Sequence, residues 1–228
     1  MVPEQRNAPL VVFGAGGRAG LAVVAEALRR GRPVVGVVRD PARQERLAAL
    51  GEDVTVVAGD LTDQDSVAAV VPGEVAAVVN AVTPFTAPPE SFEDFDPDYY
   101  VRLAENLVQA ARGSRVLEIG LAATLRTGSG RVFEDPAAFP AFLRPFAEAR
   151  MKGLAAWREQ PAEVDWLVLT PPPGLSLEAP TTGEYRLGGD VLDSPAADLP
   201  LSYADLATAV LDQIDRPTVS RQQVSVYR

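Results

Sequence analysis

Short apolar runs alternate with segments of helical periodicity along most of the chain. Six runs are nearly continuously apolar and rich in β-branched residues, as expected for strands covered on both faces; they occupy residues 10–13, 33–38, 54–58, 75–80, 115–119 and 165–169. Between them, helices are predicted at residues 19–30, 42–50, 63–70, 99–112 and 142–159. This alternation is typical of βαβ units, so the sequence predicts an α/β fold with a doubly wound parallel sheet.

The C-terminal part of the sequence is less regular than the rest. It predicts a hairpin at residues 183–193 around Gly188 and Gly189, an amphipathic helix at 202–215 with Ser202 as its N-cap, and a final strand at 223–227. The 228 residues contain no internal repeat and no interdomain linker. We therefore expect a single domain over residues 1–228, in which residues from about 171 to 228 decorate the substrate side.

Composition narrows the classes of partner and chemistry. The net charge of −10, without a cluster of Lys or Arg, argues against a nucleic-acid partner. The sequence has no basic-then-apolar leader and no run approaching about 18 apolar residues, so we expect a cytoplasmic protein that does not associate with membranes. The absence of Cys and His excludes thiolate nucleophiles, imidazole bases and most zinc sites, and we predict no metal site.

The segment VVFGAGGRAG (residues 11–20) places four glycines directly after a predicted strand. Gly14 ends that strand, Gly16 and Gly17 let backbone approach a ligand closely, and Gly20 permits tight packing of the next helix. Unpaired amides at the helix N-terminus suit a pyrophosphate. An unliganded strand-to-helix turn is the alternative, but it needs only one or two glycines. The predicted cofactor contacts here are Gly14, Gly16, Gly17, Arg18, Ala19 and Gly20.

The residue after the second predicted strand discriminates between NADP and NAD. A carboxylate there accepts hydrogen bonds from the adenosine ribose, whereas an arginine pairs with a 2′-phosphate. Arg39 follows that strand, and Arg18 in the glycine segment is a second guanidinium for the same phosphate. Two arginines favour NADP. The alternative is that Asp40 holds the ribose of NAD.

Two later strand ends supply further candidate contacts. Thr62 and Asp65 predict a capping box for the following helix, which leaves Asp60, with Leu61 beside it, for the adenine; an ordinary polar turn is the alternative. After the fourth strand, residues 80–82 open a long Pro-rich connection, where a cofactor ribose and the substrate are expected. The candidates there are Asn80, Ala81 and Val82, although Asn80 is equally suited to capping its own strand.

These residues resemble the short-chain dehydrogenase/reductase superfamily, in its atypical branch with Gly-x-x-Gly-x-x-Gly at Gly14, Gly17 and Gly20. With the segments VRDPAR, GDLTD and 183–215, the sequence looks like bacterial proteins labelled NADH-flavin reductases, relatives of the biliverdin reductase B and NmrA-like groups. The resemblance covers essentially the whole chain and implies a Rossmann fold with a nicotinamide cofactor. Such relatives include reductases, isomerases and redox sensors without catalysis.

The sequence departs from the Tyr-x-x-x-Lys pair that the resemblance implies for catalysis. Glu148 stands where the tyrosine is expected, and Lys152, the single lysine, follows four residues later. One interpretation is that Lys152 holds ribose hydroxyls; the other is a solvated pair between Glu148 and Lys152. Thr124 is the candidate for the substrate-binding serine of the superfamily. Candidate proton donors or stacking surfaces are Tyr99, Tyr100, Tyr185 and Tyr203.

The missing tyrosine favours one class of acceptor. A carbonyl reductase without it lacks a proton donor, whereas a flavin or quinone that accepts hydride takes its proton from water. The sequence therefore predicts an NAD(P)H-dependent reductase with a planar small-molecule substrate such as a flavin or quinone, using NADP, with NAD as the alternative. A non-catalytic NADP-binding redox sensor and an isomerase or dehydratase that retains its cofactor stay open, as does a homodimer.

Overall fold

The computed structural model describes residues 8–228 except residues 86, 88, 112 and 193–197. Its central sheet has the strand order β10-β12-β8-β5-β4-β1-β2-β3. The strands are β1 (Leu10–Phe13), β2 (Val34–Val38), β3 (Val54–Ala58), β4 (Ala77–Asn80), β5 (Arg115–Ile119), β8 (Trp166–Thr170), β10 (Arg186–Leu187) and β12 (Gln222–Tyr227). Neighbouring strands run parallel, except that β10 is antiparallel to β12. The predicted doubly wound Rossmann sheet is confirmed.

The chain changes direction across the sheet between β1 and β4. It builds β1, β2 and β3 outward on one side and then returns to β4 on the other side of β1. The loops that follow β1 and β4 therefore diverge, and this topological switch point is where open α/β sheets bind ligands.

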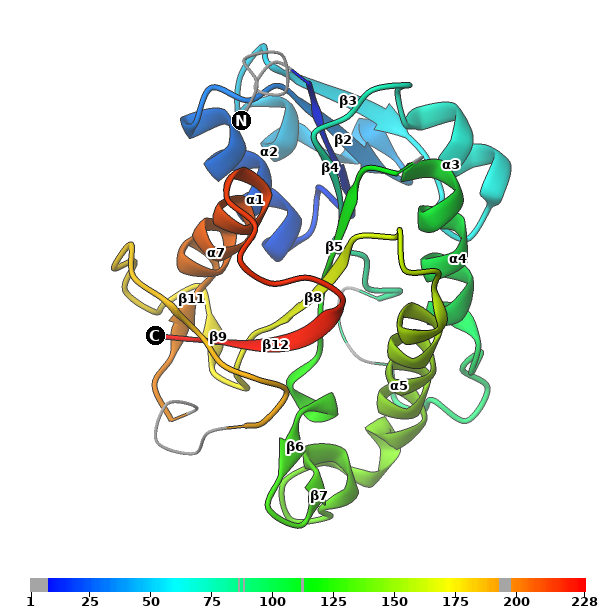
Figure 1. The fold of residues 1–228 in the computed structure, drawn as a ribbon, viewed down its shortest axis with the longest axis vertical. Helices are drawn as coiled ribbons and strands as arrows, with labels where there is room; N and C mark the ends of the chain where they lie inside the picture. Colours follow the sequence, from blue (N-terminus) through cyan, green and yellow to red (C-terminus); the bar gives the residue numbers. More distant parts are fainter. Residues whose placement is uncertain (1–7, 86, 88, 112, 193–197) are drawn as a thin grey trace.

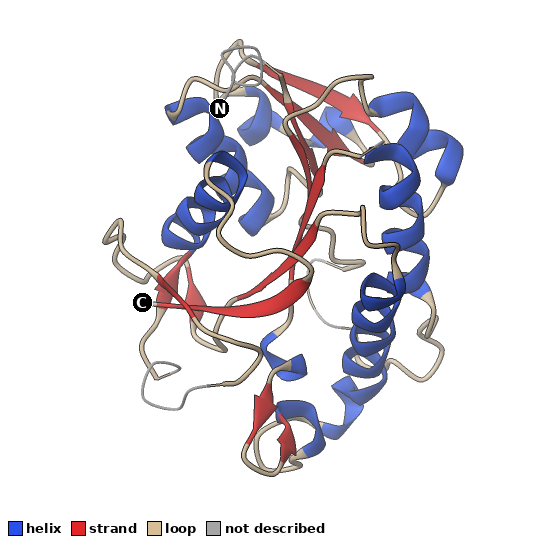
Figure 2. Cartoon of the chain, in the orientation of Figure 1, coloured by secondary structure: helices blue, strands red, loops and turns tan. Residues whose placement is uncertain are grey.

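Helices cover both faces of the sheet (Figures 1 and 2). One face carries α1 (Arg18–Arg29), the short α2 (Glu45–Ala48) and α7 (Tyr203–Asp215), and the other carries α3 (Gln64–Val70), α4 (Tyr99–Ala111) and α5 (Arg144–Glu159). The remaining short elements are η2 (Pro41–Arg43), η3 (Ala122–Thr124), η4 (Val132–Glu134), η5 (Ala141–Leu143), β6 (Arg126–Thr127), β7 (Gly130–Arg131), β9 (Leu175–Ser176) and β11 (Leu201–Ser202). The two helical layers bury the central strands β1, β4, β5 and β8 on both faces, as their apolar sequences require, whereas the edge strand β3 is partly exposed.

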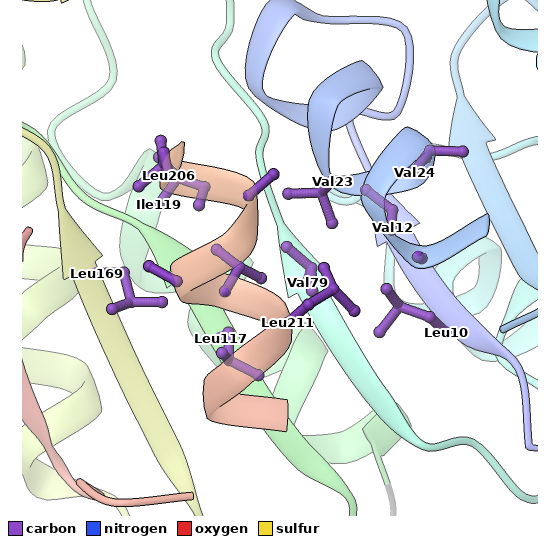
Figure 3. Packing of buried hydrophobic residues seen from close by; sticks show 14 of the residues in the cluster. Leu10, Val12, Val23, Val24, Val79, Leu117, Ile119, Leu169, Leu206 and Leu211 are labelled. Atoms are coloured by element: carbon purple, nitrogen blue, oxygen red, sulfur yellow. The ribbon is translucent and has the colours of Figure 1, made fainter. Parts of the chain in front are cut away.

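Alternate residues of β1 pack into different cores because successive side chains of a strand point to opposite faces. Leu10 and Val12 join the core that includes residues of α1 and α7, where Val23 and Leu206 lie (Figure 3). Val11 and Phe13 join the core formed with α4 and α5. The apolar run that predicted this strand therefore reflects burial on both sides.

The helix predicted at residues 42–50 is interrupted. The structure has the 3-10 turn η2 and then α2, separated by Gln44, whose backbone (φ −116, ψ 44) is not helical. The first turn begins at Pro41, one residue before the predicted helix, because the Asp40 side chain accepts a hydrogen bond from the amide of Ala42 and caps this turn. This local capping competes with a continuous helix.

The C-terminal part contains one wrong prediction and one confirmed element. The hairpin at 183–193 does not form within the described residues: β10 pairs with β12, with Leu187 opposite Val226, and residue 193 lies outside the description. The helix at 202–215 is confirmed as α7, and the Ser202 side chain accepts a hydrogen bond from the amide of Asp205. Since β12 and α7 belong to the central layers, the segment after residue 171 is more than a decoration.

In the described part of the chain, no helix has the length and apolar character needed to cross a lipid bilayer.

Candidate functional site

A cavity of about 970 Å³ lies at the carboxyl ends of the parallel strands. We call the part lined by the loops after β1, β2 and β3 the glycine end; its residues are Gly14, Gly16, Gly17, Arg18, Ala19, Arg39, Gln44, Gly59, Asp60, Leu61 and Thr62. We call the part lined from β4, β5 and β8 onward the aromatic end; its residues are Phe85, Leu121, Phe139, Leu143, Phe146, Arg150, Pro171, Pro172, Pro173, Leu175 and Tyr203. The volume is near the upper limit of ordinary small-molecule sites, roughly 300–1,000 Å³.

Two glycines of the segment, Gly14 and Gly20, are required by the packing of the chain itself. Gly14 has φ +74, a left-handed conformation that favours glycine, and a Cβ there would lie 2.7 Å from the carbonyl oxygen of Ala81. A Cβ at Gly20 would overlap the carbonyl oxygen of Gly14. Gly20 therefore packs α1 against the loop, as the sequence indicates, and it does not line the cavity.

The other glycines present bare backbone to the cavity. Gly17 is the N-cap of α1, and a Cβ there would meet only the carbonyl oxygen of Gly14, at 3.3 Å, before entering open space. Among the described residues no side chain caps this helix end, and the first turn contains no acidic residue. The first-turn amides, including those of Arg18 and Ala19, are thus left for a ligand at the positive end of the helix dipole.

Gln44 was not singled out from the sequence. Its side chain lies against Gly16, where a Cβ would overlap the amide group of Gln44, and both residues line the cavity. Gln44 reaches the cavity because the chain breaks between η2 and α2 at this residue. The sequence signal that could have revealed it is Asp40 followed by Pro41, which favours a separate capped turn over one continuous helix.

The glycine end contains two arginines that form no salt bridge with a described carboxylate. Arg18 and Arg39 both line the cavity and are exposed. Asp40 is engaged elsewhere: it accepts from the Ala42 amide at 3.1 Å and pairs with Arg43 at 3.1 Å. Asp40 does not line the cavity, so the arginines rather than the carboxylate face a ligand there.

Asp60 and Leu61 line the glycine end as well. The Oδ1 atom of Asp60 accepts hydrogen bonds from the amide and the hydroxyl of Thr62, at 2.8 and 2.7 Å. The predicted capping box is wrong, because the N-cap of α3 is Asp63, which accepts from the amides of Asp65 and Ser66. Asp60 therefore shapes its turn through one oxygen while it borders the cavity.

Of the three candidate residues after β4, two line the cavity and one does not. Ala81 and Val82 line the cavity, whereas Asn80 is fully buried and does not. The Oδ1 atom of Asn80 accepts from the Val82 amide at 3.0 Å, and its Nδ2 donates to Glu118 Oε2 at 3.1 Å. Asn80 thus fixes the loop that borders the site. This agrees with the alternative that Asn80 caps its own strand.

The structure does not bring the three catalytic candidates to the cavity. Lys152 donates to Asp98 at 2.8 Å and Glu148 accepts from Arg144 at 3.1 Å, in exposed pairs. Buried Thr124 donates to the carbonyl oxygen of Leu121.

The rotational phase of α5 explains why Glu148 and Lys152 do not reach the cavity. Each residue advances an α-helix by about 100°, so positions 148 and 152 share the solvent face while position 150 faces the sheet. Spacing alone could not fix that phase.

Two of the four tyrosines reach the cavity. Tyr99 and Tyr203 line it, and burial raises the pKa of Tyr99, which keeps its phenol protonated at neutral pH. Tyr100 is fully buried, and burial likewise raises its pKa. Tyr185 donates to Asp212 at 2.9 Å, and burial followed by this bond raises the pKa of Tyr185 to about 12.

A buried polar cluster supports the aromatic end. The Glu118 carboxylate on β5 accepts from Arg150 Nη1 at 3.2 Å and from Trp157 Nε1 at 3.0 Å, in addition to Asn80. Both partners of the Glu118 and Arg150 ion pair are more than nine-tenths buried. The sequence carried a signal for this cluster, because Glu118 interrupts an otherwise apolar strand interior.

Aromatic and proline side chains form the rest of the aromatic end. The rings of Phe85 and Phe146 meet edge to face, with centroids 5.1 Å apart. Residues 171–173, which follow β8, are prolines that line the same part. Flat, rigid surfaces of this kind suit a planar ligand.

Comparisons with known proteins agree with this geometry. A family model described as NAD(P)H-binding matches residues 14–217. YwnB from Bacillus subtilis is 28% identical over 220 residues, which span 94% of this chain and 96% of YwnB.

Solved structures share the fold along its whole length. A Streptococcus pneumoniae protein described as a "putative NADH-flavin reductase" has a TM-score of 0.76 at 24% identity, covering 97% of this chain and 100% of that one. A "putative epimerase" from Bacteroides thetaiotaomicron has a TM-score of 0.75 at 26% identity, covering 97% of each chain.

Proposed function

The chain belongs to the NAD(P)H-binding family, and on this premise we propose that it is an NADPH-dependent oxidoreductase whose acceptor is a planar molecule such as a flavin or a quinone. The observation that carries the proposal is a single cavity that joins a phosphate cradle at the glycine end to a flat, apolar aromatic end. The cofactor carries hydride chemistry of its own, so the protein needs to contribute binding, orientation and exclusion of water.

The residues at the glycine end fit a dinucleotide. Bare backbone at Gly17 and the uncapped first turn of α1 suit the pyrophosphate, and the space that a side chain at Gly17 would fill is open beyond the Gly14 carbonyl oxygen, which a Cβ would meet at 3.3 Å. The unpaired guanidinium groups of Arg18 and Arg39 suit the 2′-phosphate of NADP. Asp60 and Leu61 border the adenine side, and Ala81 and Val82 border the route toward the aromatic end.

The aromatic end supports an acceptor that needs no protein acid. Of the described side chains that line this end, none is a carboxylate or a lysine, and Tyr203 is its one phenol. No described lysine lines the cavity beside Tyr203, so the Tyr and Lys pair of a carbonyl reductase is not assembled there. An epimerase or carbonyl reductase requires a group that moves a proton at a fixed atom, whereas a reduced flavin or quinone takes its proton from water. The side chains that line the aromatic end therefore favour a flavin or a quinone as the acceptor.

The test is turnover of NADPH by the purified protein with FMN, riboflavin and small quinones, followed as loss of the absorbance of the reduced cofactor. We expect oxidation that depends on both protein and acceptor, and tight NADPH binding by calorimetry. Tight binding with no turnover across flavin, quinone and carbonyl acceptors contradicts the reductase proposal and favours a redox sensor.

A further inference from the structure

Arg150 brings a buried guanidinium to the aromatic end. Its side chain is 8% exposed and lines the cavity from α5. Nη1 donates to Glu118 Oε1 and to the carbonyl oxygen of Ile119, both at 3.2 Å, whereas buried Nε has no partner. Within the described residues, both close hydrogen bonds of this guanidinium come from Nη1, and the Tyr100 hydroxyl is a further polar group beside it. Because Nε is closed off from the cavity, Nη2 is the donor that a ligand can reach, and a buried donor is unfavourable unless a group accepts from it.

The neighbours of Arg150 fix its position. Glu118 is held in turn by Asn80 and Trp157, so the ion pair rests on three elements, β4, β5 and α5. The ring of Tyr100 lies under the guanidinium, with its centroid 3.9 Å from Cζ. The orientation of the free donors is therefore set before any ligand binds.

The same pair limits the charge of that ligand. Glu118 neutralises Arg150, so this buried region offers directed N–H donors with no net positive charge. A carboxylate or phosphate would lose the hydration of its full charge on entering this region, where no net positive charge compensates it. A carbonyl oxygen of an uncharged molecule enters without that penalty, and the charge that it gains during reduction meets donors already oriented toward it.

We propose that Arg150 hydrogen-bonds a carbonyl oxygen of a neutral planar acceptor, the ring system of a flavin or a quinone, and stabilises the negative charge that this oxygen gains on reduction. This inference rests on the proposed function. In the balanced reaction, NADPH, a quinone and one proton give NADP⁺ and a hydroquinone. A C–H bond of the dihydronicotinamide breaks, its electron pair and hydrogen form a bond to one quinone oxygen, and the opposite oxygen carries the negative charge until water protonates it. Arg150 acts on the charged oxygen.

The variants must separate loss of the ligand contact from loss of the fold. Arg150→Met alone leaves Glu118 buried without its cation, which endangers folding. The double variant Glu118→Gln with Arg150→Met removes both charges and keeps an acceptor for Asn80 and Trp157. Arg158→Met is the matched control, because Arg158 is exposed on the same helix and outside the cavity lining. Circular dichroism checks that each variant is folded.

The first readout is binding without turnover. Riboflavin, whose ring is uncharged, is titrated into protein saturated with NADP⁺ and followed by quenching of flavin fluorescence. We expect the double variant to bind riboflavin on the order of tenfold more weakly while its NADP⁺ affinity is unchanged. The Arg158 variant should match the wild type in both.

The second readout is the rate of NADPH oxidation with quinones of decreasing reduction potential. Poor acceptors depend more on stabilisation of the charged oxygen, so the double variant should lose more rate with them than with good acceptors. A merely structural role would lower all rates by a similar factor.

The outcomes distinguish this inference from the proposed function. A folded double variant that binds riboflavin and reduces the whole quinone series like the wild type overturns the role of Arg150 and leaves the reductase standing. A wild type that oxidises no NADPH but binds riboflavin through Arg150 overturns the reductase and leaves the binding role. Absence of riboflavin binding by the NADP⁺-loaded wild type overturns the inference outright.

Discussion

The glycine end of the cavity is formed mainly by backbone, whereas the aromatic end is formed by side chains. The glycine end depends mainly on backbone: a left-handed Gly14, a bare Gly17 and the uncapped start of α1, all within seven consecutive residues. The aromatic end depends on side chains from separate elements, such as Phe85, Arg150 and the prolines after β8. Under the proposed function, the backbone of the glycine end holds the cofactor that the family shares, and the converging side chains of the aromatic end select the acceptor. The predictions below test that division.

Arg150→Met should give the largest effect on stability, because it leaves the buried Glu118 carboxylate without its cation. Loss of one partner of a buried pair costs about 3–5 kcal/mol, so we expect the free energy of unfolding in urea to fall by that order. The double variant with Glu118→Gln should recover most of the loss, and Arg158→Met should change little. Equal stability of the single and double variants contradicts a structural pair at the aromatic end.

Gly17→Val should abolish cofactor binding without unfolding the protein. The backbone at Gly17 (φ −76, ψ 168) is extended and accepts any residue, while the valine side chain would occupy the space over the helix N-terminus. We expect the NADPH dissociation constant to rise on the order of a hundredfold or more by calorimetry. Gly73→Val is the control, since Gly73 is exposed with open space around it. Unchanged affinity in a folded Gly17 variant would place the phosphates elsewhere.

Arg39→Ala should discriminate between the two cofactors. A charge-assisted hydrogen bond to phosphate is worth about 1.5–3 kcal/mol, so NADPH should bind about tenfold or more weakly while NADH changes little. Arg18→Ala should act in the same direction but less strongly. Arg43→Ala is the control, because Arg43 pairs with Asp40 and does not line the cavity. A wild-type preference for NADH, or equal weakening of both cofactors, contradicts the assignment of NADP.

Lys152→Met should have the smallest effect. Lys152 pairs with Asp98 on the surface, and exposed pairs contribute roughly 0–1 kcal/mol to stability. We expect NADP⁺ affinity and NADPH oxidation to remain within about twofold of the wild type. A loss of an order of magnitude would mean that the lysine reaches the ribose, the first interpretation of its position in the sequence.

The sequence predicted the strands closely because each is a local apolar run, whether it is buried on both faces, as in β1 and β5, or partly exposed at the sheet edge, as in β3. Residues 10–13, 54–58 and 115–119 coincide with β1, β3 and β5. The hairpin at 183–193 failed because β10 is two residues long and pairs with β12, almost forty positions later, so its partner leaves no local signal.

The same distinction holds within the site. The glycine segment could be interpreted from sequence because strand, loop and helix follow one another directly. The aromatic end could not, because Arg150 is one of three arginines on α5, a helix whose phase depends on tertiary packing. Glu118, a carboxylate inside an apolar strand, was the residue that could have indicated a buried partner, but it was not singled out from the sequence.

The packing of α1 against α7 has a consequence for biosynthesis. Val23 and Val24 of α1 share a core with Leu206 and Leu211 of α7. Arg30 binds Asp215 across 185 positions of the chain. Translation proceeds from the N-terminus, so α1 keeps an apolar face uncovered until α7 leaves the ribosome. The core of the first βα unit is therefore completed only when nearly the whole chain has been made.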